Sequence, residues 1–466
     1  MLMMKRPLAF LAVLVSTLVP ALSLSNRLSA APVSVEGFSY VKTVGGIAEY
    51  RLEANGLQVL LLPERSAPVV TFQVTYRVGS RNEVTGTTGA THLLEHLMFK
   101  GSANFNTEKG NKVDQILDPI GAINNATTWL DRTNYYATFG SEHLPLVVEM
   151  EADRMRGLLL REDDRRPEMT VVRNEFERGE NNPFQLLIKE LFHAAFVAHP
   201  YHHSTIGWRS DIEKVSIGKL REFYDTFYWP NNATVSVIGD FTPENALRLI
   251  KQHYGAIPQS PHPIPEMYTE EPEQTGPRRL IVKKAGQLGV VALGHKIPAA
   301  LHPDFPALTI LSAILTDGNN SRLYKKLTDQ SLTTSVQAFS GFFRDPSLHI
   351  TFAAMAPGAK HDEVEKAALA GIEELKAGGV TDVEVTTAIS KYLAQSAFGR
   401  DGSFAIAAGL NEAIAAGDWT SYYTFDDRIK EVTAADVKRV ANKYLVEDQS
   451  STGWFVPVVP AETANK

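Results

Sequence analysis

Alternation of hydrophobic and polar residues predicts several β-strands in the first half of the chain. Residues 70–78 (VTFQVTYRV) alternate with a period of two over most of their length, which is typical of a strand that buries one face. Residues 56–62 (GLQVLLL) form a second candidate strand. Residues 121–128 and 133–138 predict a β-hairpin that turns at Asp131-Arg132. The first half is therefore expected to contain antiparallel strands.

Apolar residues at helical spacing follow this hairpin. They predict a helix over residues 144–160. A buried strand over residues 234–238 then leads, through a turn, to a helix that begins near Thr242. Strands and helices thus alternate through the first half of the chain.

The second half repeats this order after a proline-rich, acidic stretch, residues 258–277 (PQSPHPIPEMYTEEPEQTGP), which is typical of a linker. Residues 348–376 are expected to correspond to residues 234–254 as strand, turn and helix. The strands and helices predicted in the second half cover residues 279–283, 289–296, 304–315, 348–354 and 361–377.

The first residues of the chain have the order of a secretory signal peptide. Lys5 and Arg6 precede an apolar run over residues 8–22, and small residues follow it. The run is too short to be a convincing membrane span. We therefore predict a signal peptide over residues 1–31, a periplasmic or secreted protein, and no membrane span once the signal is removed.

Composition narrows the possible functions. The chain has 466 residues, of which 44% are hydrophobic and 21% charged, as in soluble globular proteins of more than one domain. Its 46 basic and 53 acidic residues give a net charge of −7, and it lacks the basic field that nucleic-acid binding requires, so no nucleic-acid partner is expected. Because there is no cysteine, neither a disulfide nor a thiolate metal ligand is available.

The stretch from Thr91 to Phe99 (THLLEHLMF) places three chemically competent side chains at helical spacing. His92 and His96 are four residues apart, so on a helix both imidazoles can reach one Zn²⁺. Glu95 lies between them, where a general base can take a proton from water at the metal. This is an H-x-x-E-H arrangement, the inverse of the H-E-x-x-H zinc-protease motif. The alternative is two surface histidines near a glutamate.

The longer run over residues 89–102 (GATHLLEHLMFKGS) resembles the zinc helix of the pitrilysin-type (M16, inverzincin) metallopeptidases. That family also contains the subunits of the mitochondrial processing peptidase. The resemblance implies a zinc-dependent endopeptidase with one Zn²⁺ per chain. It also implies an α+β fold of two homologous α/β units, each with a mostly antiparallel sheet flanked by helices. The expected domains are residues 40–257, which bind zinc, and 279–459, joined by a linker over 258–278.

The resemblance also implies a third zinc ligand on another helix, over residues 167–178 (PEMTVVRNEFER). Glu175 is the expected ligand, and Glu177 is its competitor, with the alternative of being a solvated charge. Glu168 lies seven residues before Glu175, two helical turns back on the same face. It matches a family glutamate that approaches the site without binding zinc, so it is expected to support a ligand.

In the resembled family, the hairpin over residues 121–138 carries the edge strand with which a substrate peptide pairs. The family's N-A-x-T element corresponds here to residues 125–128 (NATT), which makes Asn125 and Ala126 the expected substrate contacts. Strand addition binds peptide backbone whatever its sequence, so it suits varied extended peptides.

Two consecutive histidines, His202 and His203, follow in a loop further along the chain. They lack an acidic partner and are interpreted as solvated or capping residues.

The second half departs from the family pattern at one informative place. Self-sufficient members carry an arginine and a tyrosine that hold substrate near zinc, but residues 327–334 (LTDQSLTT) have threonine at both places. Arg322 and Tyr324 are expected to be packing and turn residues instead. The resemblance therefore implies a heterodimer whose homologous partner supplies the missing pair. A non-catalytic assembly or scaffold subunit and a metal-dependent hydrolase of a non-peptide substrate are the alternatives.

Overall fold

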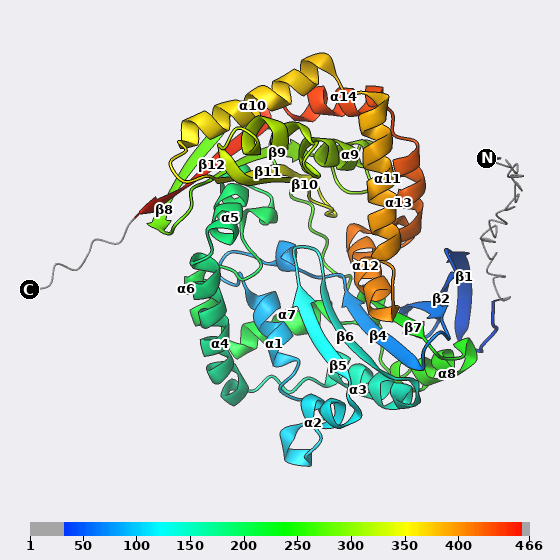
Figure 1. Cartoon of the computed structure of the whole chain (residues 1–466). Coiled ribbons are helices and arrows are strands. Elements are labelled where there is room, and N and C mark those ends of the chain that lie inside the picture. The colour runs from blue at the N-terminus through cyan, green and yellow to red at the C-terminus, as the bar shows by residue number, and fades with distance from the viewer. Residues whose placement is uncertain (1–31, 459–466) are drawn as a thin grey trace, which may run out of the picture. The chain divides into compact units, whose positions relative to one another are not determined.

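The computed structural model describes residues 32–458 of the chain (Figure 1). These residues form two mixed β-sheets with helices packed against them. The predicted signal peptide lies outside the described residues. The first sheet has the strand order β1-β2-β3-β7-β4-β6-β5 and the second has the order β10-β11-β9-β12-β8. The strands are β1 (Phe38–Val44), β2 (Ile47–Leu52), β3 (Gln58–Pro63), β4 (Val69–Tyr76), β5 (Ile123–Thr128), β6 (Thr133–Gly140), β7 (Ala233–Gly239), β8 (Arg278–Ala285), β9 (Val290–Ile297), β10 (Thr333–Ser340), β11 (Ser347–Met355) and β12 (Ser450–Val458).

Helices lie on both faces of each sheet. Those of the first half are α1 (Ala90–Leu97), α2 (Val113–Leu117), α3 (Leu144–Gly157), α4 (Glu162–Glu180), α5 (Pro183–Ala195), α6 (Arg209–Lys214), α7 (Ile217–Phe227) and α8 (Pro243–Tyr254). Those of the second half are α9 (Phe305–Thr316), α10 (His361–Gly378), α11 (Asp382–Phe398), α12 (Ser403–Ala416), α13 (Ser421–Lys430) and α14 (Ala434–Tyr444). No helix within residues 32–458 is long and apolar enough to span a membrane.

The two halves share one topology, which confirms the predicted α+β fold of two α/β units. Strands β3-β7-β4-β6-β5 of the first sheet correspond to β8-β12-β9-β11-β10 of the second. In each set only the first pair is parallel, β3 with β7 and β8 with β12. The expected match of residues 348–376 to 234–254 is wrong, because the counterpart of β7 is β12 and β11 corresponds to β6. Chain order alone does not determine which strands pair.

One helix of each half packs on the sheet of the other half. Helix α5 packs on β8, β9 and β12, and α12 packs on β4 and β7 (Figure 1). Leu187 of α5 is fully buried and lies against Gly453 of β12, where any added Cβ would come within 2.9 Å of it. On α12, Leu410 and Ile414 pack with Leu60 and Ile238 of the first sheet. This reciprocal exchange ties the two halves together through apolar burial.

The polar face of β4 is buried under α12 rather than exposed to water. Thr71, Gln73 and Thr75 are fully buried and lie two residues apart along the strand. They bond to Ser403 (2.8 Å), the Ala407 carbonyl (2.9 Å) and Asn411 (2.8 Å) of α12, four residues apart. Two strand residues advance about 6.6 Å and four helix residues about 6.0 Å, so the two repeats stay in step.

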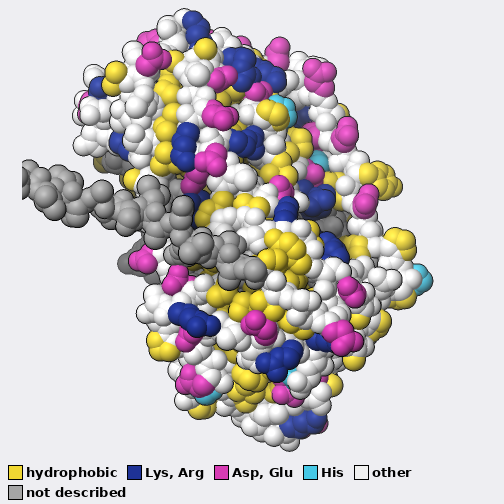
Figure 2. Space-filling view, turned by 90° about the vertical axis from the view of Figure 1, so that its right-hand side faces the viewer, with side chains coloured by type: hydrophobic (Ala, Val, Ile, Leu, Met, Phe, Trp, Pro, Cys, Tyr) yellow, Lys and Arg dark blue, Asp and Glu magenta, His cyan; other side chains and the backbone are white. Residues whose placement is uncertain are grey.

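The predicted linker forms neither helix nor strand over residues 258–276, but it is fastened to the rest of the chain. The Glu271 carboxylate accepts hydrogen bonds from the backbone N–H groups of Val197 (2.9 Å), Ala198 (2.9 Å) and His199 (3.1 Å). Gln274 donates to the Ser450 carbonyl at 2.6 Å. The proposed domain boundaries at residues 257 and 279 stay a prediction. On the face shown in Figure 2, acidic and basic side chains are intermingled.

Candidate metal centre

Helix α1 is anchored at its N-terminus by a buried carboxylate. Glu83 accepts hydrogen bonds from the backbone N–H groups of Gly89 and Thr91, each at 2.8 Å, which satisfies donors that a helix leaves free at its start. Gly89 has φ 84°, and a Cβ there would lie 2.4 Å from the Ile206 carbonyl oxygen, so only glycine fits. Leu93, Leu94 and Leu97 are buried. These contacts leave the face bearing His92 and His96 directed at α4.

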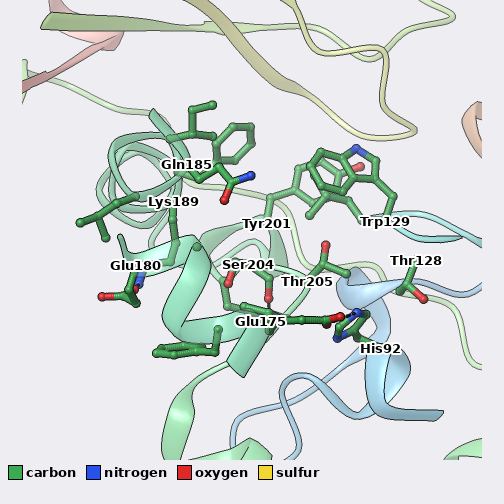
Figure 3. A pocket seen from close by; sticks show the side chains of 18 of the residues that line it. His92, Thr128, Trp129, Glu175, Glu180, Gln185, Lys189, Tyr201, Ser204 and Thr205 are labelled. Carbon is green, nitrogen blue, oxygen red and sulfur yellow. Dashed lines mark hydrogen bonds and ion pairs between the residues drawn. The ribbon is translucent and has the colours of Figure 1, made fainter. Parts of the chain in front are cut away.

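Side chains from α1 and α4 converge at one point. The Nε2 atoms of His92 and His96 are 3.3 Å apart, and Glu175 Oε2 lies 3.6 Å from the first and 3.5 Å from the second. Figure 3 shows Glu175 directed from α4 toward His92. Within residues 32–458 this is the one group of three or more His, Asp or Glu side chains able to hold a metal ion.

The spacing of these atoms fits zinc. Two imidazole nitrogens bound to Zn²⁺ at 2.0–2.1 Å with a tetrahedral angle lie about 3.3–3.4 Å apart, as the two Nε2 atoms do. Two imidazoles and one carboxylate are also a donor set of catalytic zinc sites, which leave one position for water or substrate. Burial, and then the adjacent His96, lower the pKa of His92 to about 3, so its imidazole is neutral as a ligand must be.

His96 is held by a second glutamate. Its Nδ1 lies 2.7 Å from Oε1 of Glu168, whose other oxygen contacts Lys100. Burial lowers the pKa of His96, but the hydrogen bond with Glu168 and the charges of Glu175 and Glu95 outweigh it and raise the pKa overall. Burial raises the pKa of Glu168, yet its bonds to His96 and Lys100 leave it lowered. An ionised Glu168 therefore orients the His96 ring with Nε2 toward Glu175.

The competitor Glu177 does not reach this point. It is half-exposed and lies 3.7 Å from Arg209 of α6. The geometry therefore favours Glu175 over Glu177.

Glu95 lies beside this group and is held by the hairpin. The Thr128 hydroxyl, at the end of β5, donates a hydrogen bond to Glu95 Oε2. Burial raises the pKa of the Glu95 carboxyl, although Thr128 and the charges of His96 and Arg132 act against it. A raised pKa makes the carboxylate a stronger base for a proton taken from water. Sequence reasoning did not single out Thr128, although it closes the N-A-x-T element.

Strand β5 is the edge of the first sheet, as predicted, because within residues 32–458 it pairs with β6 alone. The Ala126 side chain is buried toward the core, whereas Asn125 is exposed. The Asn125 side-chain oxygen accepts the Ala126 N–H at 2.9 Å. The edge is therefore placed beside Glu95, and one of its backbone donors is bonded to its own side chain.

An apolar cavity of about 490 Å³ opens beside His92 and Glu175 (Figure 3). Tyr201 and Lys189 contribute polar groups to it. Phe339 and Phe343 come from the second half, and no motif in the sequence indicated them. The aromatic residues among its walls are Trp129, Phe176, Phe192, Tyr201, Phe339 and Phe343.

The remaining candidates take no part in the metal group. His203 differs from its interpretation as a solvated or capping residue without an acidic partner, because it is buried and its Nδ1 lies 3.7 Å from Glu83 Oε2 and 3.2 Å from the Ser204 carbonyl. Burial lowers its pKa to about 4. His202 bonds to the His199 carbonyl. Arg322 pairs with Glu384 of α11 at 2.5 Å, and Tyr324 packs on the core of the second half, which agrees with packing roles.

The repeated α/β units and the His-His-Glu group with an adjacent glutamate match the architecture and the ligand set expected of an M16 metallopeptidase. Comparisons with known proteins agree. Residues 58–208 match the family model described as insulinase (peptidase family M16), and residues 214–392 match the peptidase M16 inactive domain. The chain belongs to peptidase family M16.

Relatives of this chain include named proteases. The zinc protease PqqE of Helicobacter pylori is 34% identical over 409 residues, covering 86% of this chain and 91% of that protein. The probable β subunit of the mitochondrial processing peptidase of Arabidopsis thaliana is 23% identical over 423 residues, covering 88% and 79%. The crystal structure of a protease from Helicobacter pylori superposes with a TM-score of 0.82 at 32% identity, covering 90% of this chain and 99% of that one.

Proposed function

We propose that this chain is a zinc-dependent endopeptidase that cleaves peptides or unfolded protein segments. The observation that carries the proposal is the convergence of His92, His96 and Glu175 at zinc-ligand spacing, with the buried Glu95 beside them. One Zn²⁺ per chain would be held by these three residues. The names of its relatives as zinc proteases support this assignment.

Each neighbouring residue has a defined part in the reaction. Bound zinc would polarise the scissile carbonyl and acidify the attacking water. Glu95 accepts the proton of that water and returns it to the leaving amine. Thr128 fixes the Glu95 carboxylate, and Glu168 fixes the His96 ring.

The substrate would pair as an extended strand with the outer edge of β5. Asn125 and Ala126 are the proposed contacts, and the Asn125 side chain must release the Ala126 N–H before a substrate carbonyl can accept it. A side chain next to the scissile bond would enter the apolar cavity. The aromatic walls of that cavity favour a bulky apolar residue.

The site has the composition expected of one subunit of a heterodimer. Among the described residues that line the cavity, only Phe339 and Phe343 come from the second half, and neither side chain can donate a hydrogen bond. We propose that a homologous subunit supplies the arginine and tyrosine that this half lacks. We further propose an exported, periplasmic or secreted, protein whose signal peptide over residues 1–31 is removed, with domains over residues 40–257 and 279–459.

The alternative is a non-catalytic scaffold subunit of a peptidase complex. The intact group of His92, His96, Glu175 and Glu95 disfavours it, because a scaffold has no need for a carboxylate at zinc-ligand spacing from two histidines, nor for a buried glutamate beside them.

Hydrolysis of a quenched fluorescent peptide tests the proposal. The zinc-loaded chain is assayed alone and mixed with a homologous subunit that carries the arginine and tyrosine. Activity in the mixture alone, lost when this chain carries Glu95→Gln, supports a split site with catalysis here. Activity that survives Glu95→Gln in the mixture would instead favour the scaffold role, and activity of the chain alone would contradict the need for a partner.

A further inference from the structure

The turn that joins β5 to β6 is held by the second half of the chain at two adjacent residues. Asp131 bonds to the loop over residues 341–346, and Arg132 bonds to helix α12. Both side chains are buried in a turn, where charged residues are normally solvated. The same hairpin carries Thr128, which holds Glu95, and the edge to which we assign substrate binding.

Arg132 connects α12 to the end of β5. Its Nε donates to Glu412 Oε1 at 3.0 Å, and Nη2 donates to the same oxygen. Its Nη1 donates to the Thr127 carbonyl at 3.1 Å and also bonds to the Thr127 hydroxyl and to Asn134 Oδ1. One guanidinium thus spans from a helix of the second half to the residue before Thr128.

Asp131 makes the second attachment. One of its oxygens accepts the Tyr201 hydroxyl at 2.7 Å, and the other accepts the Arg344 N–H at 3.0 Å. Arg81 lies 3.5 Å from Asp131 and bonds to Asp345 at 2.8 Å. The loop that carries Phe343 is therefore fixed against the turn.

We propose that Glu412 is a positioning residue for the reaction, acting through Arg132 on Thr127 and Thr128. The inference rests on the proposed peptidase function and extends it to the second half, whose family model describes an inactive domain. In Glu412→Gln the Arg132 guanidinium keeps only a neutral, weaker acceptor on α12, so its other arm is held less firmly toward Thr127. The end of β5 then loosens, and Thr128 no longer holds Glu95 in place.

Glu412 can be changed with little risk to the fold, because its side chain is 42% exposed whereas that of Arg132 is 10% exposed. Glu412→Gln removes the charge and keeps the shape. Glu412→Asp keeps the charge. A matched control is Glu374→Gln on α10, which breaks the ion pair of another exposed glutamate with Lys326, also in the second half.

The experiment uses the zinc-loaded full chain, with its partner subunit present for kinetics. Glu412→Gln is expected to lower kcat about tenfold, the effect of a barrier higher by about 1.4 kcal/mol. Bound zinc and Tm should stay as in the wild type. Glu412→Asp should recover roughly half of the lost kcat, and Glu374→Gln should change nothing. Hydrogen exchange of the amides over residues 123–138 should be faster in Glu412→Gln than in either the wild type or Glu374→Gln.

Two results would overturn the proposal: unchanged exchange of residues 123–138 in Glu412→Gln, or a fall in kcat that follows a loss of zinc. Amide hydrogen exchange can be measured whether or not the protein hydrolyses peptides. Faster exchange in a protein that cleaves no peptide would therefore support the attachment of the turn through Glu412 while refuting the peptidase function.

Discussion

His96 Nδ1 and Glu168 Oε1 lie 2.7 Å apart, so the second imidazole of the metal group is oriented by a buried carboxylate from α4. Such partners keep the ring in the tautomer and direction that a metal requires. The same helix carries Glu175, two turns further on. Helix α4 thus supplies one proposed ligand and orients another.

Replacing Glu168 by glutamine should weaken zinc binding. The amide cannot accept the His96 N–H as strongly as a carboxylate does, and we expect the zinc affinity to fall by about 10–100-fold. A competition titration against a chromophoric chelator measures it. Glu177→Gln is the control, because Glu177 lies on the same helix and pairs with Arg209 instead. Equal affinities for the two variants would contradict the role of Glu168.

Glu95→Gln should separate metal binding from catalysis. The variant keeps His92, His96 and Glu175 but cannot take up a proton, so we expect full zinc content and a kcat lower by at least about 10²–10⁴-fold. His92→Ala should lose the metal itself. Zinc analysis and peptide hydrolysis on the same preparations distinguish the two effects. Near-normal activity of Glu95→Gln would show that another group is the base.

The local part of the site was predictable, because helical periodicity relates residues close in sequence. His92, Glu95 and His96 lie on one short helix, and their spacing alone placed two imidazoles on one face. The choice between Glu175 and Glu177 as the third ligand could not be made in that way, because it depends on how α4 is rotated against α1. Thr128 and Phe343 meet the site only through tertiary packing, and no periodicity indicates them.

The strands were largely predictable, but their pairing was not. Residues 70–78 alternate as expected for a strand, yet the polar face of β4 is buried by α12, which lies more than three hundred residues later in the chain. The alternation indicates two different faces and does not say what covers each one. Strand β12 was not predicted from the sequence. Without it, the predicted order of strands matched β7 to β11 instead of to β12.

The pair Arg322–Glu384 should make stability depend on acid. The hydrogen bond from Arg322 holds the pKa of Glu384 at about 2, below its usual value of 4.5. Because the folded-state pKa is the lower one, the pair stabilises the protein above about pH 4.5, and this contribution is lost as the pH falls toward 2. Glu384→Gln should therefore be less stable than wild type in urea at pH 7. The difference should shrink at pH 3.5, and a constant difference would contradict the linkage.

The packing of α5, a helix of the first half, on the second sheet should be essential to stability. Leu187 is fully buried against the second sheet, and Leu187→Ala should lower the free energy of unfolding by about 2–5 kcal/mol. Val197→Ala, at a position 64% exposed, should change it by less than about 0.5 kcal/mol. Urea unfolding of both variants measures the difference. A small effect of Leu187→Ala would mean that α5 does not hold the second sheet.

Phe339→Ala should change which peptides are cleaved rather than how fast the chemistry proceeds. The ring lines the cavity and stacks on Phe352 at 5.9 Å, yet it is 40% exposed, so its loss should be tolerated by the fold. With this wall removed, a bulky apolar substrate side chain loses contacts that a small one never made. The ratio of kcat/KM between peptides with phenylalanine and alanine next to the scissile bond should therefore fall about tenfold. Phe404→Ala is the matched control, because Phe404 is 44% exposed in the same half but packs on Tyr136 away from the cavity. An unchanged ratio in Phe339→Ala, or an equal fall in Phe404→Ala, would show that the second half does not shape the substrate pocket.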